Sequence, residues 1–356
     1  MKAGVIGATG YAGAELVRLL LGHSRVDGLV LSSVSFEGGK IEEVYPNFTG
    51  IISAPLVKAE DVVETADVVF SALPHGVGEQ FAKTCVDKKT PFVDLSADFR
   101  FGDDEPAFKK WYGKGYVYPD LRKYSIYGLP ELNRKKIKEH GGAVIIGNPG
   151  CYPTGSSLGA FPALAKGLVA GTIIVDAVSG ISGGGREPSR QFHYPECADS
   201  VSPYKIGSHR HTPEITRNFT AMAETEGRAS PSLVFTPHLA PMNRGILSTI
   251  YIPLAQKAPE NNEEQVSKFR SLYADFYKDE PFVRVLPSGV IASTNRVRGS
   301  NYCDISVHLD HSGSVLIIAS AIDNMVKGAA GQAVQNMNIM LGIDEKTGLT
   351  QAPLYP

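Results

Sequence analysis

One cysteine stands where a thiol can act as a nucleophile. Cys151 lies in the segment GNPGCYPT (147–154), after a β-like run over 143–147 and before an apolar-periodic stretch that predicts a helix from Pro153. A helix N-terminus stabilises a thiolate and lowers the thiol pKa from its usual value of about 8.5. Ligands of open α/β sheets bind beyond the carboxyl ends of the strands. We therefore expect Cys151 to be the nucleophile of a covalent reaction.

Two histidines could supply the acid/base partner that such a thiol needs. His209 and His211 lie in HRHTPEI (209–215), before the expected start of a helix with Pro213 in its first turn. One of them is expected to be the general acid/base, and spacing alone does not separate them. We favour His211, because Glu214 lies three residues further on and could orient its imidazole. The loop around His209 contains glycine and serine, so His209 is expected to be held less firmly and to contact substrate.

A glycine-rich loop near the start of the sequence predicts a dinucleotide site. The segment GATGYAG (7–13) follows a strand-like run over 2–7 and opens a helical pattern over 11–21. Glycines permit a tight turn and a close approach of main-chain N–H groups to a pyrophosphate, and the helix dipole adds to the attraction. The residues expected to bind the cofactor here are Gly7, Thr9, Gly10, Tyr11 and Gly13.

The end of the second expected strand, over 28–34, bears on the choice of cofactor. NAD sites often carry an acid about 20 residues beyond the glycine loop, where it binds the ribose 2′-hydroxyl. Here Ser32 and Ser33 occupy that position, Lys40 is near, and the first carboxylate after the strand is Glu37. Hydroxyls and a cation suit a 2′-phosphate, which favours NADP. The alternative is that these serines only end the strand.

The order of strand-like and helical segments indicates an α/β fold with two domains. Over 1–150, short β-like runs alternate with helical stretches, which predicts a Rossmann-type, doubly wound parallel sheet. ALPHG (72–76) ends one of these runs, so Pro74 and His75 are expected beside the cofactor. Over 151–323, longer β-like runs with few helices between them predict an α+β catalytic domain with a mixed sheet.

Length and composition exclude several classes of protein. The chain has 356 residues, of which 43% are hydrophobic and 20% charged, so it is long enough for two domains and too apolar for a disordered protein. Its formal charge of −2 gives no broad positive field for nucleic acid or a membrane surface. No apolar run approaches the roughly 18 residues of a membrane span. The four cysteines show no metal-ligand spacing and no disulfide framework, and no signal peptide is evident, so a cytoplasmic protein without bound metal is expected.

Together these motifs resemble those of the N-acetyl-gamma-glutamyl-phosphate reductase family, essentially from end to end. The segments that carry the resemblance are GATGYAG (7–13), ALPHG (72–76), DLSADFR (94–100), YGLPEL (127–132), GNPGCYPT (147–154), SGGGR (182–186), HRHTPEI (209–215), PMNRGI (241–246) and DNMVKG (323–328). Their combination is far more specific than a glycine loop alone. The resemblance implies an NADP-binding Rossmann domain over 1–150, completed by 324–356, with a catalytic and dimerisation domain over 151–323 between them.

The resemblance also implies a reaction. It is the NADPH-dependent reduction of N-acetyl-gamma-glutamyl phosphate, an acyl phosphate, to N-acetyl-glutamate 5-semialdehyde, with release of phosphate, in arginine biosynthesis. Cys151 would attack the acyl carbon and expel phosphate, hydride would reduce the thioester, and the imidazole would handle the proton. A thiolate is a good nucleophile and a good leaving group, so one difficult reduction becomes two easier steps. The family further implies a homo-oligomer, either a dimer or a tetramer.

Further contacts with substrate and cofactor come from the same resemblance. Arg100 would clamp the phosphate, as in related semialdehyde dehydrogenases, a role that suits a guanidinium fork; the alternative is a surface ion pair. Asn148 would orient the acyl group near the thiol. Arg186 and Arg244 are weaker candidates for the substrate carboxylate. Asn324 resembles a contact to the nicotinamide amide.

Three other functions stay open at the level of sequence. A paralogous enzyme of lysine biosynthesis reduces a carrier-linked aminoadipyl phosphate, but an acidic carrier would favour a basic groove, and 182–215 has no strong basic excess. Aspartate-semialdehyde dehydrogenase fits the cysteine and histidine motifs less well. The third is a non-catalytic regulator that binds NADP, and the intact Cys151 and HRH motif argue against it.

Overall fold

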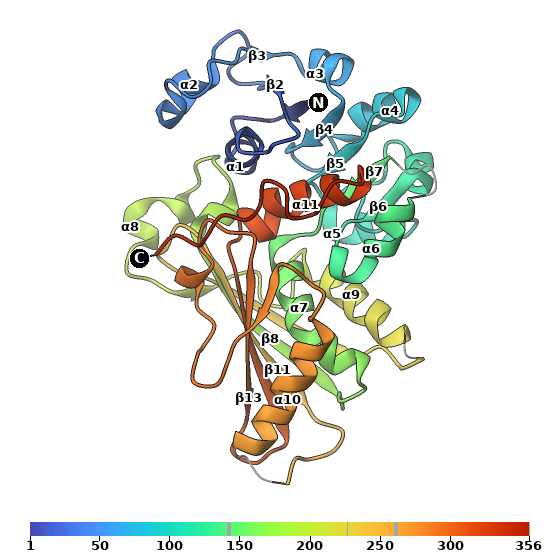
Figure 1. Cartoon of the computed structure of the whole chain (residues 1–356), viewed down its shortest axis with the longest axis vertical. Helices are drawn as coiled ribbons and strands as arrows, with labels where there is room; N and C mark the ends of the chain where they lie inside the picture. Colours follow the sequence, from blue (N-terminus) through green and yellow to red (C-terminus); the bar gives the residue numbers. More distant parts are fainter. Residues whose placement is uncertain (141–143, 226, 260–262, 356) are drawn as a thin grey trace. The chain divides into compact units, whose positions relative to one another are not determined.

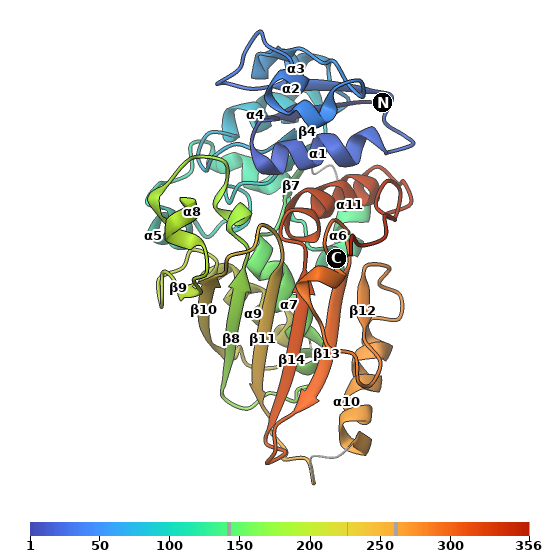
Figure 2. The ribbon, with the colours of Figure 1, turned by 90° about the vertical axis from the view of Figure 1, so that its left-hand side faces the viewer.

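Two sheets of seven strands each organise the computed structural model of this chain (Figures 1 and 2). The structure describes residues 1–140, 144–225, 227–259 and 263–355. Met1–Pro149 and Ala329–Thr350 form one compact unit, and Gly150–Gly328 form a second, together with the chain from Gln351 onward. The first sheet is parallel and the second is mixed, so the predicted fold class is confirmed.

Every strand pair in the sheet of the first unit is parallel. Its order is β3-β2-β1-β4-β5-β7-β6. The chain first builds outward from β1 through β2 to β3 and then returns to place β4 on the other side of β1, which is the doubly wound arrangement. The strands are β1 (Lys2–Ile6), β2 (Gly28–Ser32), β3 (Leu56–Val57), β4 (Val68–Ser71), β5 (Phe92–Asp94), β6 (Ser125–Tyr127) and β7 (Ile145–Gly147).

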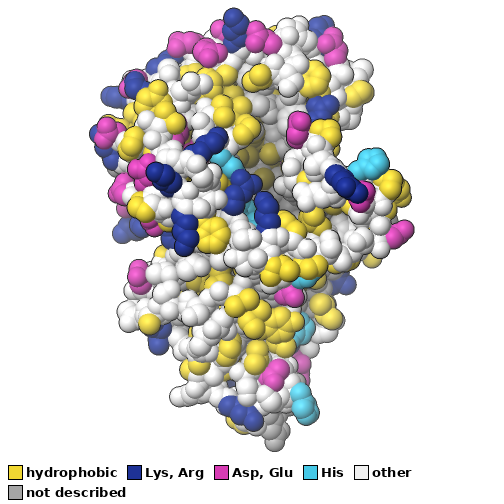
Figure 3. All heavy atoms as spheres, turned by 180° about the vertical axis from the view of Figure 1, so that it is seen from behind, with side chains coloured by type: hydrophobic (Ala, Val, Ile, Leu, Met, Phe, Trp, Pro, Cys, Tyr) yellow, Lys and Arg dark blue, Asp and Glu magenta, His cyan; other side chains and the backbone are white. Residues whose placement is uncertain are grey.

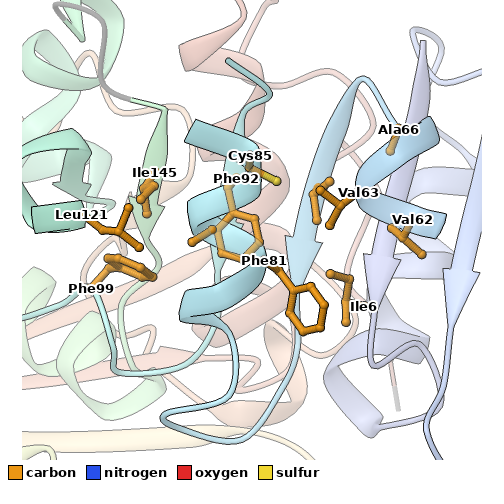
Figure 4. Close-up of a cluster of buried hydrophobic side chains, with 12 residues drawn as sticks. Ile6, Val62, Val63, Ala66, Phe81, Cys85, Phe92, Phe99, Leu121 and Ile145 are labelled. Carbon is orange, nitrogen blue, oxygen red and sulfur yellow. The ribbon is translucent and has the colours of Figure 1, made fainter. Parts of the chain in front are cut away.

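Helices cover both faces of this sheet. On one face, α3 and α4 pack on the strands through a buried apolar cluster that includes Val62, Phe81, Cys85 and Phe92 (Figure 4). On the other face lie α1 and α11 (Figure 2). The helices of this unit are α1 (Tyr11–Leu21), α2 (Ile41–Val44), α3 (Ala59–Thr65), α4 (Glu79–Lys88), α5 (Glu105–Tyr112), α6 (Pro130–Glu139) and α11 (Gly331–Met340).

The sheet of the second unit combines parallel and antiparallel pairs. Its order is β12-β13-β14-β11-β8-β10-β9, with parallel pairs at β8–β10 and β12–β13 and antiparallel pairs elsewhere. The strands are β8 (Thr172–Ser179), β9 (Ser202–Pro203), β10 (Ser232–Leu239), β11 (Ile246–Pro253), β12 (Val283–Val285), β13 (Cys303–Leu309) and β14 (Val315–Ile322).

One face of this second sheet is covered by helices α7 (Cys151–Ala165), α9 (Thr212–Glu224) and α10 (Glu263–Phe276). In Figure 2 the other face of the central strands is turned to the viewer, with α7 and α9 behind. Helix α7 is buried around nearly its whole circumference, as expected for a helix without a polar face. Gly159 lets it approach β11 closely, since a Cβ there would lie 2.3 Å from Cδ1 of Ile250. A short helix, α8 (Tyr194–Cys197), lies in the long connection before α9.

Several predicted elements differ from the observed ones. Helix α7 begins at Cys151 rather than Pro153, and the strand expected over 143–147 begins at Ile145, with position 143 outside the described residues. The expectation of few helices in the second unit is wrong at α10, whose buried side is formed by residues such as Tyr273. A π-helical turn (Val326–Ala330) precedes α11 directly. None of the helices in the described residues is long and apolar enough to cross a membrane.

Candidate active site

Cys151 is the first residue of α7, and Gly150 is the N-cap. The thiol is half-buried and not part of a disulfide. The first turn of α7 contains no acid, so no carboxylate of α7 itself opposes the effect of the helix dipole, which favours a thiolate at this position. Cys85 and Cys303 are buried instead, and burial raises the pKa of the Cys85 thiol to about 12. Cys197 is half-buried in α8 and does not share this setting.

The N-termini of α7 and α9 lie side by side. The buried carboxylate of Glu214, in the first turn of α9, accepts a hydrogen bond from the Gly150 main-chain N–H at 2.8 Å. One turn further along α9, Asn218 donates to the hydroxyl of Ser157 at 3.0 Å. The positive ends of two helix dipoles therefore meet near Cys151, an arrangement that favours anionic groups. Glu214 thus bonds to the main chain at Gly150, and its expected role in orienting His211 stays a prediction.

His211 is the N-cap of α9, and Pro213 lies in the first turn as predicted. His209 is 7% exposed, and its Nδ1 accepts a hydrogen bond from the His211 main-chain N–H at 3.0 Å. The two imidazole rings lie 4.9 Å apart, centroid to centroid. The expectation that His209 is held loosely is therefore wrong, because tertiary packing encloses a loop whose glycine and serine suggest freedom.

Three aromatic residues that the sequence did not single out surround the histidines. The ring of Tyr152, the residue after Cys151, lies 5.5 Å from His209 and 5.9 Å from His211, centroid to centroid. Tyr204 and Phe235 each lie 5.4 Å from His209. The Tyr204 hydroxyl donates to that of Tyr152 at 3.2 Å. The position of Tyr152 beside Cys151 is the one sequence signal available, since Tyr204 and Phe235 come from a loop and a strand far along the chain.

Burial and nearby charges shift the pKa values of His209, Tyr152 and Tyr204. Burial, followed by the positive charges of Lys205 and Arg210, lowers the pKa of His209 to about 4. Burial raises the pKa of Tyr204 to about 12, and the negative charge of a Cys151 thiolate adds to that rise. At neutral pH His209 is therefore a neutral imidazole and both nearby phenols are protonated, since burial also raises the pKa of Tyr152. His209 is poorly suited to proton transfer in this range.

Asn324 joins three of the sequence motifs within the second unit. Its Oδ1 accepts the Gly245 main-chain N–H at 2.7 Å, and its Nδ2 donates to the Ser182 hydroxyl at 3.0 Å. The side chain is 2% exposed. It thus holds together the segments SGGGR, PMNRGI and DNMVKG. Its expected contact with nicotinamide stays a prediction.

The arginines expected to bind the substrate carboxylate differ in their surroundings. Arg244 is 32% exposed, and its guanidinium lies 3.6 Å from the buried Asp323 carboxylate. Arg186 is exposed in the loop after β8. For both arginines, binding of the substrate carboxylate stays a prediction.

Among the described residues, no group of three or more His, Cys, Asp or Glu side chains could hold a metal ion.

The glycine-rich loop of the first unit has the geometry of a phosphate cradle. Gly7 has φ +83°, and a Cβ there would meet the Ala72 carbonyl oxygen at 2.8 Å. A Cβ on Gly13 would lie 2.2 Å from the Gly7 carbonyl oxygen, so only glycine lets α1 start against the loop. Gly10 is the N-cap and makes no side-chain bond, and the first turn of α1, which begins at Tyr11, holds no acid. These features fit a dinucleotide pyrophosphate.

Thr9 and Ser33 connect this loop to the end of β2. Their hydroxyls lie 2.6 Å apart, and Ser32 and Ser33 are both buried. The Tyr45 hydroxyl donates to the Thr9 carbonyl at 3.0 Å, and Lys40 is exposed. The Ser33 hydroxyl thus has a protein partner, a contact that the sequence did not indicate.

A second loop of the first unit, ALPHG (72–76), is hydrogen-bonded to the segment DLSADFR (94–100). The Ala97 N–H donates to Nδ1 of His75 at 2.9 Å, and the Gly76 N–H donates to both carboxylate oxygens of Asp98, at 2.9 and 2.8 Å. Pro74, which precedes His75 in the chain, is exposed. Burial raises the pKa of Asp98 and, with the charge of Asp98 itself, also that of Asp94. The loop is therefore held in place before any ligand arrives.

Arg100 and Asn148 have structural partners. Arg100 is 5% exposed and donates to the Asn148 carbonyl at 2.7 Å and to the Leu95 carbonyl at 2.8 Å. The Asn148 amide donates to the Ala329 carbonyl at 3.1 Å and accepts from Asn336 at 3.0 Å. Arg100 is not a surface ion pair, so that alternative is excluded. Both side chains therefore fix the path of the chain through Asn148, at the end of the first unit.

The comparisons with known proteins agree with this arrangement. Residues 2–140 match the family model described as "Semialdehyde dehydrogenase, NAD binding domain", and residues 151–324 match "Semialdehyde dehydrogenase, dimerisation domain". The chain therefore belongs to the semialdehyde dehydrogenases, a family of oxidoreductases with a nicotinamide-dinucleotide domain. Within them it is a member of the N-acetyl-gamma-glutamyl-phosphate reductases. A protein of that name from Clostridium beijerinckii is 51% identical over 350 residues, 98% of each chain.

Other relatives and solved structures point the same way. Proteins named N-acetyl-gamma-glutamyl-phosphate reductase from Brachyspira hyodysenteriae and Thermoanaerobacter sp. are 48% and 46% identical, over 99% and 100% of each chain. Aspartate semialdehyde dehydrogenase II from Vibrio cholerae, in complex with ASA, has a TM-score of 0.71 at 17% identity, over 96% of this chain and 98% of that one. The aspartate semialdehyde dehydrogenase with NADP from Candida albicans gives 0.64 at 19%, over the same shares. These structural likenesses establish the fold.

Proposed function

We propose that this chain reduces N-acetyl-gamma-glutamyl phosphate to N-acetyl-glutamate 5-semialdehyde with NADPH and releases phosphate, as in arginine biosynthesis. The observation that carries the proposal is the meeting of two helix N-termini, with Cys151 first in α7 and His211 at the N-cap of α9. A thiolate nucleophile, a titratable imidazole and two positive dipole ends are what acyl transfer from an anionic substrate requires. The shared name of full-length relatives supports this substrate.

The chemistry divides into two steps at Cys151. Its thiolate attacks the acyl carbon, and the C–O bond to phosphate breaks as the C–S bond of a thioester forms. Bound NADPH supplies hydride to the thioester carbon. His211 donates a proton to the oxygen of the resulting thiohemiacetal, then takes it back as the C–S bond breaks and the aldehyde leaves. The first-turn N–H groups of α7 would stabilise the negative oxygen in both steps.

The nicotinamide cofactor is proposed to be NADP, held by the first unit. Gly7, Gly10 and Gly13 would admit the pyrophosphate, with Thr9 and Tyr11 beside them. The end of β2 carries Ser32 and Ser33 and no acid, which supports a 2′-phosphate rather than a free ribose hydroxyl. Pro74, His75 and Asn324 would complete the cofactor contacts. The cofactor domain would comprise 1–150 and 324–356, and 151–323 would be the catalytic and dimerisation domain.

Substrate contacts are proposed for the remaining polar residues of the motifs. Arg186 and Arg244 are the candidates for the substrate carboxylate. Arg100 and Asn148 would act near the phosphate and the acyl group, and their bonds to carbonyl and amide groups hold their side chains in place. Glu214 would act through Gly150 rather than on substrate directly.

The protein is also proposed to form a homo-oligomer through the open face of the second sheet. Val234, Ile174, Tyr251 and Ile317 lie side by side across β10, β8, β11 and β14. The first three are 49%, 43% and 37% exposed, which is unusual for a contiguous apolar row. Hydrophobic side chains also gather on the surface of the second unit in Figure 3. The printed description of the matching dimerisation model supports this proposal.

An experiment on this face would measure mass in solution. Ile174→Glu should reduce the mass found by light scattering to that of one chain, because a charge would be buried at the interface. Val117→Glu alters an apolar side chain of the first unit that is 59% exposed, more than Ile174, and should leave the mass unchanged. A monomeric wild-type protein, or an unchanged mass for Ile174→Glu, would argue against this interface.

The substrate is tested by running the reaction in reverse. N-acetyl-glutamate 5-semialdehyde with phosphate and NADP⁺ should give the highest kcat/KM, above free glutamate semialdehyde, aspartate semialdehyde and a carrier-linked aminoadipate semialdehyde. Highest activity with the carrier-linked substrate would favour the lysine-pathway alternative. Tight NADP binding without turnover of any of these would indicate a regulator.

A further inference from the structure

His209 lies at the centre of a closed group of rings. Tyr152, Tyr204, Phe235 and His211 all have ring centroids 4.9–5.5 Å from it. These rings come from α7, the loop before α9, β10 and the N-cap of α9. A side chain that is 7% exposed and packed on four rings has little freedom to reach for a substrate.

The hydrogen bond of His209 fixes its chemical form. Nδ1 accepts the His211 main-chain N–H at 3.0 Å, so Nδ1 carries no proton and the neutral ring holds its proton on Nε2. The charged groups that act on the ring are Lys205 and Arg210, both positive, and burial adds to their effect in disfavouring an imidazolium. The ring therefore stays neutral at neutral pH.

The hydrogen bond between the His211 N–H and His209 Nδ1 lies at the start of α9, where main-chain N–H groups lack acceptors within the helix. The first N–H groups of a helix have no intrahelical acceptor, and the N-cap of α9 makes no side-chain capping bond. His209 Nδ1 supplies an acceptor for the main chain of His211, and the His209 carbonyl accepts the Thr212 N–H at 3.0 Å. The first bond holds the main chain of His211, from which the proposed acid/base projects, and the second holds the next residue, Thr212.

We propose that His209 is a positioning residue, which sets the main chain of His211 through Nδ1 and neither binds substrate nor transfers a proton. This inference rests on the proposed function, in which His211 handles the proton of the thiohemiacetal. It also resolves the choice that spacing left open between the two histidines. The conservative replacement should then be the one that keeps an acceptor at the δ position.

Three substitutions separate the possible roles of His209. Asn places an amide oxygen near the position of Nδ1, Gln places its amide near Nε2, and Leu removes both. His209→Leu and His209→Gln should lower kcat by about 10²-fold with little change in KM, since a displaced acid/base slows the chemical step. His209→Asn should recover most of that loss. Phe235→Leu is the matched control, because it removes a packed ring but no hydrogen bond.

The opposite pattern would overturn the proposal. If His209→Gln is the active variant, the working atom is Nε2, and if KM rises while kcat holds, the side chain binds substrate. Equal losses in His209→Leu and Phe235→Leu would leave packing as the sole role. Far-UV circular dichroism and thermal unfolding would establish that each variant is folded.

A measurement without substrate keeps this test independent of the proposed reaction. In ¹⁵N spectra of the wild-type histidines, His209 should remain the Nε2–H tautomer from pH 6 to 9. A His209 that titrates near pH 6.5, or that carries its proton on Nδ1, would refute the positioning role even if the enzyme is active. Should no semialdehyde be turned over, the proposed function fails, whereas the tautomer still decides this inference.

Discussion

The carboxylate of Glu214 accepts a hydrogen bond from the main-chain N–H of Gly150, so the first turn of α9 is tied directly to the N-cap of α7. Gly150 precedes Cys151, and His211 is the N-cap of α9. One buried side chain therefore links the start of the helix that carries Cys151 to the helix that begins at His211. The bond also gives the buried negative charge of Glu214 a main-chain partner.

Removing the Glu214 carboxylate is expected to misplace the nucleophile. Glu214→Ala leaves the Gly150 N–H without this acceptor in a buried setting, which should cost about 1–3 kcal/mol of stability and lower kcat about 10²-fold. Glu214→Gln keeps an acceptor oxygen and should retain more activity than Glu214→Ala. Steady-state kinetics and urea unfolding measure both quantities. Glu224→Ala, at the exposed end of α9, is the control. If Glu214→Ala is as active as Glu224→Ala, the Glu214 carboxylate does not position Cys151.

Cys151 is expected to be the one essential thiol. Cys151→Ser should lower kcat by roughly 10⁴-fold or more, because a serine hydroxyl has neither the nucleophilicity nor the leaving ability of a thiolate. NADPH binding, followed by the fluorescence of the cofactor, should be nearly unchanged. Cys197→Ser is the control, since that thiol is also half-buried but lies in α8. Substantial turnover by Cys151→Ser would contradict the assignment of Cys151 as the essential thiol. So would a loss of activity caused by alkylation of a different cysteine.

Gly328 leaves the space that Cys151 occupies. A Cβ on Gly328 would lie 2.8 Å from Cβ and 3.2 Å from Cα of Cys151, closer than real side chains approach. Gly328→Ala should therefore displace the nucleophile and lower kcat about 10²-fold while the protein stays folded. Gly22→Ala, whose Cβ would meet its nearest neighbour at 3.7 Å, should have no such effect. Equal kcat values for the two variants would mean that the Gly328 segment moves aside freely.

Local patterns predicted the elements that carry the nucleophile and the favoured acid/base. Cys151 and His211 stand at helix starts because an apolar period begins after each and a proline occupies each first turn, and these are short-range signals. The parallel sheet followed equally from strands that alternate with helices. The mixed sheet was predicted as a class, but its order was not, because long-range pairing leaves little trace in one sequence.

The partners of the site residues could not be predicted in the same way. A motif shows that Arg100, Asn148 and Asn324 are present, but not that carbonyl groups and main-chain N–H groups occupy their hydrogen bonds. The burial of His209 depends on Tyr204 and Phe235, which come from separate elements. Side-chain identity is local, whereas burial and hydrogen-bond partners are set by tertiary packing.

Cofactor preference is expected to follow the charge at the end of β2. Ser33→Asp should weaken binding of NADPH and shift the preference toward NADH, because a carboxylate repels the 2′-phosphate and can accept from a ribose hydroxyl. Ser33→Ala is the control, since it removes the 2.6 Å contact with Thr9 without adding charge. The measurement is the ratio of kcat/KM for the two cofactors. A wild-type enzyme that already uses NADH and NADPH equally would show that this strand end does not select.

The depressed pKa of His209 predicts how stability depends on pH. The imidazole has a pKa of about 4 in the folded protein, whereas that of an exposed histidine is about 6.5. The unfolded chain therefore binds the proton more readily, and the stability that His209 contributes is complete above pH 6.5 and lost as the pH falls toward 4. Over this range the contribution of His209 to the free energy of unfolding changes by about 3 kcal/mol.

Buried Asp94 and Asp98, whose pKa values are raised, act in the opposite sense, so the comparison must be between the wild type and His209→Asn. Urea unfolding from pH 7.5 to 4.5 should show a smaller loss of stability in the variant, and identical slopes would mean that His209 is protonated in the folded protein as easily as in the unfolded chain.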